Sequence, residues 1–201
     1  MTKSEPIPGV PTPIVMEATI RLMAGDDQNQ TGLVDAARAG DRAACGRLVE
    51  PVLAHALGGA IVITRSHADG ADAVQDALLA AWQRLDTLRD PAAFPAWFRT
   101  IVVRSAQRIA RRRRILMPLE VVDAAGLTDS ELDASLDRRL LGRAFDRLDV
   151  DDRALLTLRY LWDLPVADTA AALDIPPGTV KSRTNAAIGR LRAAFDAEAR
   201  R

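Results

Sequence analysis

The 201-residue chain has few of the residues that build disulfide frameworks and metal centres. It holds one cysteine, Cys45, and two histidines, His55 and His67. A single cysteine excludes a disulfide framework and a cysteine-based zinc site, so we interpret Cys45 as a small buried hydrophobe rather than a redox sensor. The histidines have no acidic cluster at ligand spacing beside them. We interpret both as structural or exposed, and expect no metal and no other cofactor.

Aromatic residues make up only 4% of the chain, and its net charge is zero. So few aromatic side chains exclude an RNA-binding surface based on stacking. The sequence has no phosphate-binding glycine loop, nucleophile elbow or metal-ligand motif, which predicts no catalytic residue and no enzyme. It also shows no signal peptide and no apolar run approaching the roughly twenty residues of a membrane span. We therefore expect a cytoplasmic protein without membrane insertion.

Apolar residues recur at helical spacing from residue 33 onward, and strand-like alternation is missing, so the sequence predicts an all-α protein. Residues 66–70 are expected to form a turn. Trp82, Trp97 and Phe98 lie on apolar stripes, which places them in the expected core. The expected helices of this first half include residues 52–63, 71–85 and 92–114.

Charge is strongly separated around residue 114. Seven arginines and no acid lie within residues 99–114, whereas residues 115–137 hold six acids and no base. Pro118, Gly126 and a weak periodicity indicate a linker in the acidic segment. A flexible acidic linker would leave two small helical domains without a fixed spacing. The predicted parts are a disordered extension (residues 1–30), a first domain (31–114), the acidic linker (115–137) and a second domain (138–201).

The clearest local pattern lies near the end of the chain. Residues 166–173 predict a short helix, residues 174–177 a turn, and Pro177 or Gly178 begins a helix to about residue 197, because proline suits a first helical turn. Apolar residues are spaced to bury the angle of a helix-turn-helix, namely Ala171, Leu173, Ile175, Val180, Ile188 and Leu191. The early exposed turns of the second helix carry donors for phosphates and base edges, namely Thr179, Lys181, Ser182, Arg183 and Asn185.

Two blocks of this chain resemble the extracytoplasmic-function (ECF) sigma factors, the compact branch of the bacterial sigma-seventy family. The first runs Asp72-Ala-Val-Gln-Asp-Ala-Leu-Leu-Ala-Ala-Trp82, continues with Phe94-Pro-Ala-Trp-Phe98 and ends in the arginine run. It is similar to the family's second region, which binds the polymerase clamp and opens promoter DNA. The second block comprises residues 155–160, 166–173 and 178–183. It is similar to the fourth region, which reads the upstream promoter element.

The resemblance implies three sets of functional residues. In the family, one helix face of the first block grips core RNA polymerase, and the matching residues here are Asp72, Gln75, Asp76 and Leu79. A loop captures a base flipped out of the downstream promoter element, and the arginine helix holds the DNA backbone where it melts. The matching residues are Asp86, Thr87, Leu88, Arg89, Arg104, Arg108, Arg111 and Arg112. The last helix reads the upstream element, with Thr179, Lys181, Ser182, Arg183, Asn185 and Arg190.

The chain departs from the family pattern at several positions. Arg104 and Arg108 stand where many members have Asn and Asp, and Thr184 and Ala186 replace a common Leu and Arg in the recognition helix. Promoter sequences therefore cannot be carried over from relatives. The Gly58-Gly59 pair falls inside a helix of the family fold, where each glycine costs roughly 1 kcal/mol.

The resemblance favours a sigma factor that binds core RNA polymerase, directs it to promoters and helps to melt them. Promoter DNA, the polymerase and an anti-sigma factor are the partners that it implies, and the acidic linker resembles the family's connector toward the polymerase active-site cleft. The alternative is a stand-alone helix-turn-helix regulator. Such a regulator normally needs dimerisation to match two half-sites, and it leaves the residue 72–82 block and the arginine helix unexplained.

Overall fold

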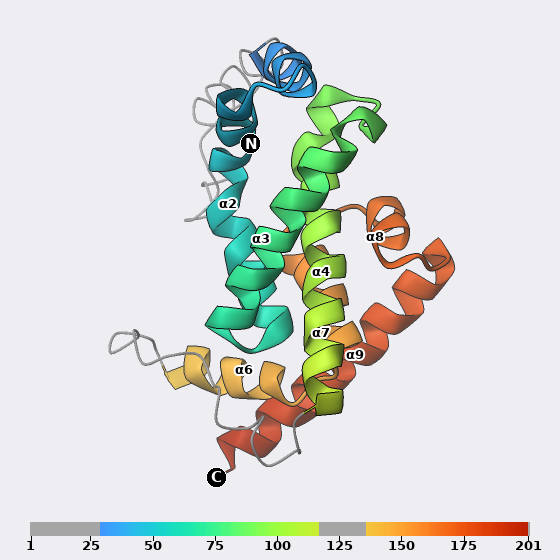
Figure 1. Cartoon of the computed structure of the whole chain (residues 1–201). Helices are drawn as coiled ribbons and strands as arrows, with labels where there is room; N and C mark the ends of the chain where they lie inside the picture. The colour runs from blue at the N-terminus through green and yellow to red at the C-terminus, as the bar shows by residue number, and fades with distance from the viewer. Residues whose placement is uncertain (1–28, 117–135, 201) are drawn as a thin grey trace, which may run out of the picture.

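A computed structural model describes residues 29–116 and 136–200, and within these ranges the chain is helical without strands. The first half consists of a helix over residues 29–38, α2 (Arg42–Thr64), α3 (His67–Arg84), the short 3-10 helices η1 (Leu85–Thr87) and η2 (Pro91–Ala93), and α4 (Phe94–Leu116). The second half consists of α6 (Leu136–Asp146), α7 (Val150–Leu156), the π-helical turn η3 (Thr157–Leu161), α8 (Val166–Leu173) and α9 (Pro177–Ala199). Figure 1 shows their arrangement. The predicted all-α class is confirmed. The expected extension and almost all of the acidic linker lie outside the described residues.

Helix α2 is a continuous element at the centre of the first half, where it packs against α3 and α4. Asp41 caps its start by accepting hydrogen bonds from the backbone N–H groups of Ala43 and Ala44 at 2.8 and 3.2 Å. Pro51 lies inside the helix without ending it. By length and composition α2 is apolar enough to cross a membrane, a property that core helices share. Our expectation that no such run exists is therefore wrong.

Helix α3 begins at His67, so the turn predicted over residues 66–70 is wrong. Ser66 caps the helix by accepting a hydrogen bond from the Asp69 backbone N–H at 3.2 Å. Gly70 lies inside the helix because α2 passes close to it. A Cβ at this position would lie 2.7 Å from Ile61 Cγ1 and 3.0 Å from the Ile61 backbone nitrogen. The glycine thus permits close helix packing and does not mark a chain reversal.

Aromatic residues at the start of α4 belong to the core of the first half. The rings of Phe94 and Phe98 stack with their centroids 5.9 Å apart, and both side chains are buried. Trp97 is partly buried against the same core, at 5.9 Å from the Phe94 ring. Trp82 is 36% exposed, so its predicted place in the core is wrong. Its ring lies at the surface of α3 instead.

The predicted helix-turn-helix is confirmed, and the predicted bounds of its first helix, α8, agree with the structure. Asp174 takes the left-handed conformation with φ 55° and ends α8, and α9 begins one turn later at Pro177. Val180 is fully buried in the angle between the helices, with Leu173, Ile175, Ile188 and Leu191 packed around that cluster. Ala171 is exposed, contrary to the prediction, and its neighbours Ala170 and Ala172 are buried in its place.

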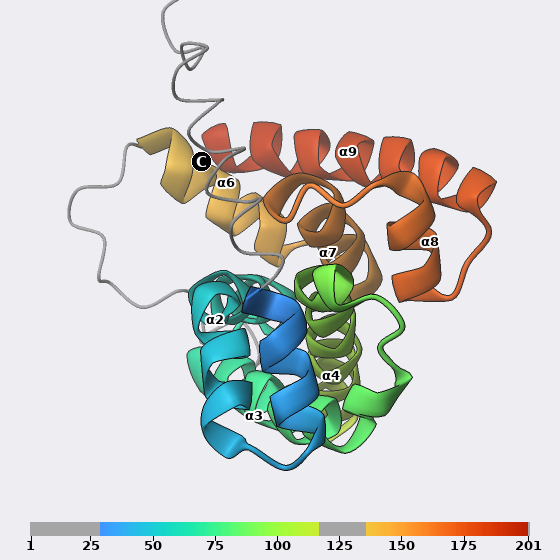
Figure 2. The ribbon, with the colours of Figure 1, turned by 90° about the horizontal axis from the view of Figure 1, so that it is seen from above.

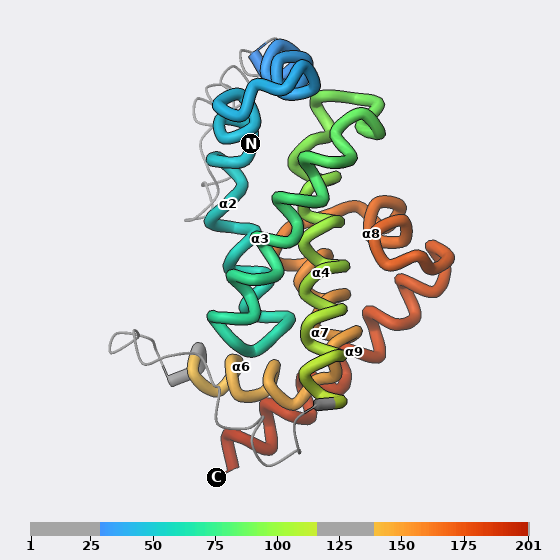
Figure 3. The backbone as a smooth tube through the Cα atoms, in the orientation of Figure 1, coloured from blue at the N-terminus to red at the C-terminus, as the bar shows by residue number. Residues whose placement is uncertain are grey.

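The two halves of the chain pack directly against each other. Figure 2 shows α6 and α9 lying across the bundle of α2, α3 and α4. Helix α7 lies between α9 and α4. The tube in Figure 3 shows α7 of the second half alongside α4 of the first. Residues of the second half join the core of the first half, namely Ala154, Leu158, Trp162, Leu164 and Ala172. In this structure the two domains are held at one spacing, which the sequence did not predict.

Candidate nucleic-acid and polymerase interfaces

The start of α9 has an exposed polar face, and the opposite face of the helix is buried. Val180, Thr184 and Ala187 are buried at intervals of four and three residues, and the Thr184 hydroxyl donates to the Val180 carbonyl at 2.7 Å. Because these positions share one helix face, the intervening side chains point outward. The exposed side chains are Lys181, Ser182, Arg183 and Asn185, while Thr179 is partly exposed. The predicted recognition face is thus brought together as one surface.

Arg190 lies farther along α9 and is committed to an ion pair. Its Nε and Nη2 atoms donate to the two carboxylate oxygens of Asp152 at 2.5 and 2.7 Å. The Asp152 side chain is buried, and its hydrogen bond raises the pKa of Arg190 above the ordinary value. A bidentate contact of this kind fixes the orientation of the guanidinium group and also pairs its charge. The structure therefore gives Arg190 a packing role inside the second half, apart from the recognition face.

The four α4 arginines that the sequence predicts to bind DNA are exposed, and three of them contact other groups of the protein. Arg108 Nη2 lies 2.7 Å from Asp76 Oδ2 of α3, and Arg111 Nη2 lies 2.5 Å from Asp151 Oδ1 of α7. Arg104 donates to the carbonyls of Ala172 and Ala171 at 3.1 and 2.9 Å. Arg112 is exposed, and the part of the chain that the structure describes offers it no ion-pair partner. The four predicted DNA-binding arginines therefore share one helix, but three of them hold other groups.

The loop between α3 and α4 is held by polar contacts within it and by Arg38, which donates to the Leu88 carbonyl. The Thr87 hydroxyl donates to the Arg84 carbonyl at 2.7 Å, and Asp90 accepts from the Ala92 N–H at 3.0 Å to cap η2. Asp86 and Arg89 are also exposed. Leu88 is only 3% exposed, so its side chain is not part of the surface that the loop presents. The side chain anchors the loop in the core.

Four predicted polymerase-binding residues lie along the outer face of α3. Asp72, Gln75 and Leu79 are exposed, and Asp76 is partly exposed. Leu79 is 59% exposed, which is unusual for a large apolar side chain. Trp82 extends this apolar strip by one further turn. The sequence interpretation missed Trp82 because its spacing also fits the buried stripe of the same helix.

Groups that could serve metal or thiol chemistry are not assembled in the described ranges. No group of three or more potential ligands is present among those residues, and His55 and His67 are exposed. Cys45 is partly buried against the core, and this burial raises the pKa of its thiol above the ordinary value. Its environment agrees with the predicted role as a small hydrophobe.

Comparison with known families accounts for both halves of the chain. The family model for Sigma-70 region 2 matches residues 48–115, and the model for Sigma-70, region 4 matches residues 138–191. The ECF RNA polymerase sigma factor SigL of Mycobacterium tuberculosis is 33% identical over 141 residues, which cover 66% of this chain and 78% of SigL. The chain belongs to the ECF sigma factors of the sigma-70 family.

Further relatives extend the likeness over nearly the whole sigma factor. SigM of Mycobacterium tuberculosis is 30% identical over 184 residues, which cover 90% of this chain and 92% of SigM. Among solved structures, the sigma factor RpoE of Bartonella quintana in complex with the anti-sigma factor NepR matches with a TM-score of 0.60 and 26% identity, over 75% of this chain and 96% of that one. CnrH in complex with the cytosolic domain of CnrY matches with a TM-score of 0.59 and 26% identity, over 82% and 96%. The chain is thus a sigma factor that directs RNA polymerase to promoter DNA.

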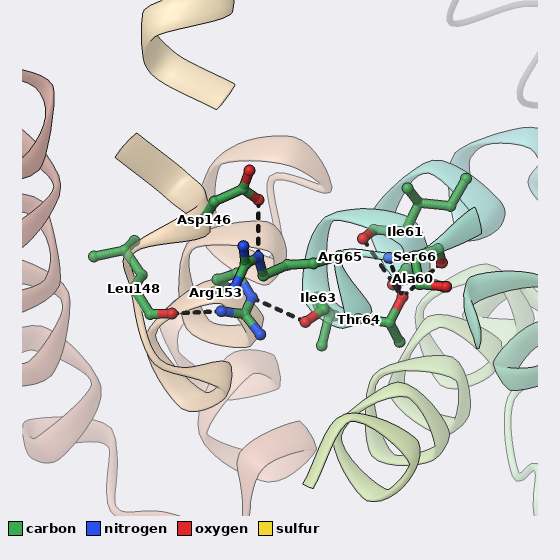
Figure 4. A network of polar contacts seen from close by, with 9 residues as sticks. All are labelled: Ala60, Ile61, Ile63, Thr64, Arg65, Ser66, Asp146, Leu148 and Arg153. Atoms are coloured by element: carbon green, nitrogen blue, oxygen red, sulfur yellow. Dashed lines mark hydrogen bonds and ion pairs between the residues drawn. The ribbon is translucent and has the colours of Figure 1, made fainter. Parts of the chain in front are cut away.

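A buried arginine joins the two halves of this sigma factor (Figure 4). Arg153 of α7 donates through Nε to the Ile63 carbonyl at 2.9 Å, and through Nη1 to the Leu148 carbonyl. Arg65 lies beside it and pairs with Asp146 of α6 at 3.1 Å. Burial first and the nearby Arg65 second lower the pKa of Arg153 to about 10, although Asp146 and Asp149 act in the opposite direction. Arg153 still carries its charge at neutral pH.

A cleft of about 420 Å³ lies between the halves. Its walls come from α4, α7, α8 and α9. Arg104 and Arg111 of the downstream-element helix and Arg183 of the recognition helix line the same cleft. Gln107 Nε2 crosses it to Asp151 Oδ1 at 2.9 Å. Residues of both predicted DNA-binding surfaces therefore line the same cleft.

Proposed function

We propose that the sigma factor reads the upstream promoter element with the start of α9. The observation that carries this is the division of that helix into a buried face at Val180, Thr184 and Ala187 and an exposed donor face. Lys181 and Arg183 supply positive charge for phosphates, whereas Ser182 and Asn185 supply hydrogen-bonding groups for base edges. A helix N-terminus placed in the major groove would bring all four to the DNA.

The downstream element is proposed to bind the loop over residues 85–93 and the outer side of α4. The loop offers Asp86, Thr87 and Arg89 at the surface, and its conformation is held by Leu88 in the core. A pre-formed loop can accept an unstacked base, whose removal from the duplex costs a few kcal/mol. The α4 arginines would neutralise backbone phosphates and release counterions. Arg104, Arg108 and Arg111 must first exchange their present partners.

Core polymerase is proposed to bind the outer face of α3. The apolar strip of Leu79 and Trp82 lies beside the carboxylates of Asp72 and Asp76. Exposed apolar groups flanked by charge are typical of protein-binding surfaces. A Leu79→Ser variant should retain its helicity and lose affinity for core polymerase in co-elution, because residue 79 is exposed in the free protein.

We also propose a partner and a cellular location for this sigma factor. Two solved relatives are complexes with anti-sigma factors, and we propose that an anti-sigma factor also binds this chain. Synthesis of RNA would remain with the polymerase, and the sigma factor would act in the cytoplasm without catalytic residues, cofactors or membrane insertion. The acidic linker would follow the family connector toward the active-site cleft. It lies almost wholly outside the described residues.

The test is run-off transcription with purified core polymerase, on a template that carries the upstream region of the protein's own gene. The double variant Lys181→Ala/Arg183→Ala should lower promoter-dependent transcript by about tenfold or more, while co-elution with polymerase is unchanged. Arg192→Ala is the matched control because Arg192 is also an exposed arginine of α9. Equal loss of transcription and polymerase binding in the double variant would show that these residues support the fold and do not read DNA.

A further inference from the structure

The helix over residues 29–38 contacts the loop between α3 and α4 through one arginine. Arg38 Nη2 donates to the Leu88 carbonyl, and Arg38 Nη1 donates to Asp35 Oδ1 at 3.3 Å. The Arg38 side chain is 29% exposed, so this contact is partly shielded from water. In Figure 1 the helix, in blue, lies at the same end of the bundle as the loop, in green. The match to the Sigma-70 region 2 model begins at residue 48, and the helix lies outside it.

The position of Arg38 is fixed by the packing of its helix and by the way that the helix ends. Val34 and Ala37 are buried in the core of the first half. Gly40 takes the left-handed conformation with φ 97°, and the backbone N–H groups of Gly40 and Asp41 donate back to carbonyls of the last turn, each at 3.0 Å. This pair of hydrogen bonds is a Schellman motif, in which glycine is favoured. Arg38 therefore extends from a short helix that is held on one face and closed at its end.

Leu88 lies in the joint between the two 3-10 turns of the loop. Its N–H donates to the Leu85 carbonyl at 3.1 Å in the first turn, and the Ala93 N–H donates to the Asp90 carbonyl at 3.0 Å in the second. Each of these bonds closes a single turn, so neither orients one turn relative to the other. The hydrogen bond from Arg38 ties the joint to a helix 50 residues away in the sequence. A bond to a charged donor is stronger than one between neutral groups.

The exposed side chains of the loop lie on either side of this joint. Thr87 precedes Leu88 and Arg89 follows it, and both are exposed while Leu88 is buried. Rotation of the backbone at Leu88 would therefore change the separation of the two exposed side chains. A flipped base is selected by hydrogen bonds to its edge, and such bonds hold only over a narrow range of distances. The loop can distinguish bases only if the joint stays in place.

We propose that Arg38 is a positioning residue for base selection in the downstream promoter element. It acts through the Leu88 carbonyl, and it keeps Thr87 and Arg89 at the separation that the preferred base requires. The inference rests on the proposed binding of the downstream element by this loop. Without the Arg38 donor the carbonyl turns to water and the joint gains freedom. The loop then loses its preference between bases to a greater extent than its binding of DNA.

The test measures base selection by the complete polymerase complex. Run-off transcription uses the upstream region of the protein's own gene, with each base of the opened segment replaced in turn after that segment is mapped by permanganate reactivity. The ratio of transcript between the best and the worst base gives the selectivity at each position. We expect Arg38→Met, which keeps the side-chain length and removes the donors, to lower the largest ratio by about fivefold, the lower end of what one base pair contributes. Arg38→Ala, which places a strong helix former there, should give the same fall, and Arg38→Lys, which keeps a cationic donor, should retain most of the ratio.

Arg47→Met is the matched control and should leave every ratio unchanged. Arg47 is an exposed arginine of the neighbouring helix α2, and its ion-pair partner is Asp41 at 4.0 Å. A uniform fall in transcript with unchanged ratios in the two Arg38 removal variants would show that the arginine supports only the fold, and would overturn the proposal. Circular dichroism of each variant measures its helicity.

Two further measurements separate the role of Arg38 from the proposed role of the loop. The double variant Thr87→Ala/Arg89→Ala removes the exposed side chains themselves. If it leaves every ratio unchanged, the loop does not select bases and both proposals fail. If it lowers the ratio and Arg38→Met does not, only the positioning role fails. In the free protein, amide hydrogen exchange at residues 88–90 should be faster in Arg38→Met than in Arg47→Met, and equal rates would overturn the hold on the joint.

Discussion

The two basic helices of this sigma factor differ in what surrounds their charged groups. At the start of α9, Lys181 and Arg183 extend from a face whose opposite side is buried. On α4, Arg104, Arg108 and Arg111 each contact a different helix, namely α8, α3 and α7. If both surfaces bind DNA as proposed, the first can do so as it stands, whereas the arginines of the second already hold other groups. A count of arginines along a helix therefore does not measure how many are available.

The exchange on α4 also links the proposed binding surfaces. Arg108 pairs with Asp76, which belongs to the proposed polymerase-binding face of α3. A polymerase contact that engages Asp76 would release Arg108 toward DNA. Exposed pairs of this kind contribute at most about 1 kcal/mol, so their exchange is energetically accessible. The buried contacts, by contrast, hold the two halves together.

The largest expected effect comes from the buried arginine that joins the halves. Arg153→Met should lower the free energy of unfolding by about 3 kcal/mol, since the Ile63 and Leu148 carbonyls lose their donor in a buried place. Urea denaturation followed by circular dichroism measures the change. Arg192→Met is the exposed control and should stay within about 0.5 kcal/mol. A loss as small as that of the control would mean that Arg153 does not hold the halves together.

Two arginines of α9 are expected to differ in role, because Arg190 supports the fold and Arg183 lies on the face proposed to bind DNA. Arg190→Ala should cost about 2 kcal/mol of stability, because the buried carboxylate of Asp152 loses a charged hydrogen-bond partner. Arg183→Ala, on the exposed face, should cost little. Thermal or urea unfolding of both variants checks this order. If Arg190→Ala unfolded like the unchanged protein but weakened promoter use, Arg190 would belong with the recognition residues.

On α4, the expected effect on stability is smaller and the effect on DNA is distinct. Arg111→Ala removes an exposed pair with Asp151 and should change stability by less than about 1 kcal/mol. In the complete polymerase complex it should reduce the slope of log affinity against log salt by about 1, the loss of one phosphate contact. Arg112→Ala should give the same change in slope. An unchanged slope for both would remove α4 from the DNA interface.

The smallest effect concerns Cys45. Because burial raises the pKa of its thiol above the ordinary value of 9.0, less thiolate is present at pH 8 and a disulfide reagent should react more slowly than with the unfolded chain. The raised pKa favours the neutral thiol in the fold, so this contribution to stability is present below pH 9 and is lost as the pH rises through the folded pKa. Equal reaction rates in folded and unfolded protein would contradict the burial of this group.

Local pattern was sufficient for much of the architecture. The helix over residues 166–173, the turn after it and the donor face of the following helix follow from spacing within a few residues, and each agrees with the structure. Local pattern is not sufficient where one residue fits two local structures. Gly70 suggested a turn, but it serves helix packing against Ile61. The position of Trp82 in the sequence fits both the buried and the exposed stripe of α3. Its exposure at the surface is decided by how α3 packs against the other helices.

The sequence by itself determined the helical class, the two-part division and the exposed polar face at the start of α9, because helix formation and amphipathic patterns act over one or two turns. The tertiary structure alone decided which arginines are occupied and how the halves meet. These contacts join residues far apart in the chain, such as Trp162 with His55 and Arg104 with Ala171. Their existence depends on how whole helices pack, which no short stretch of sequence specifies.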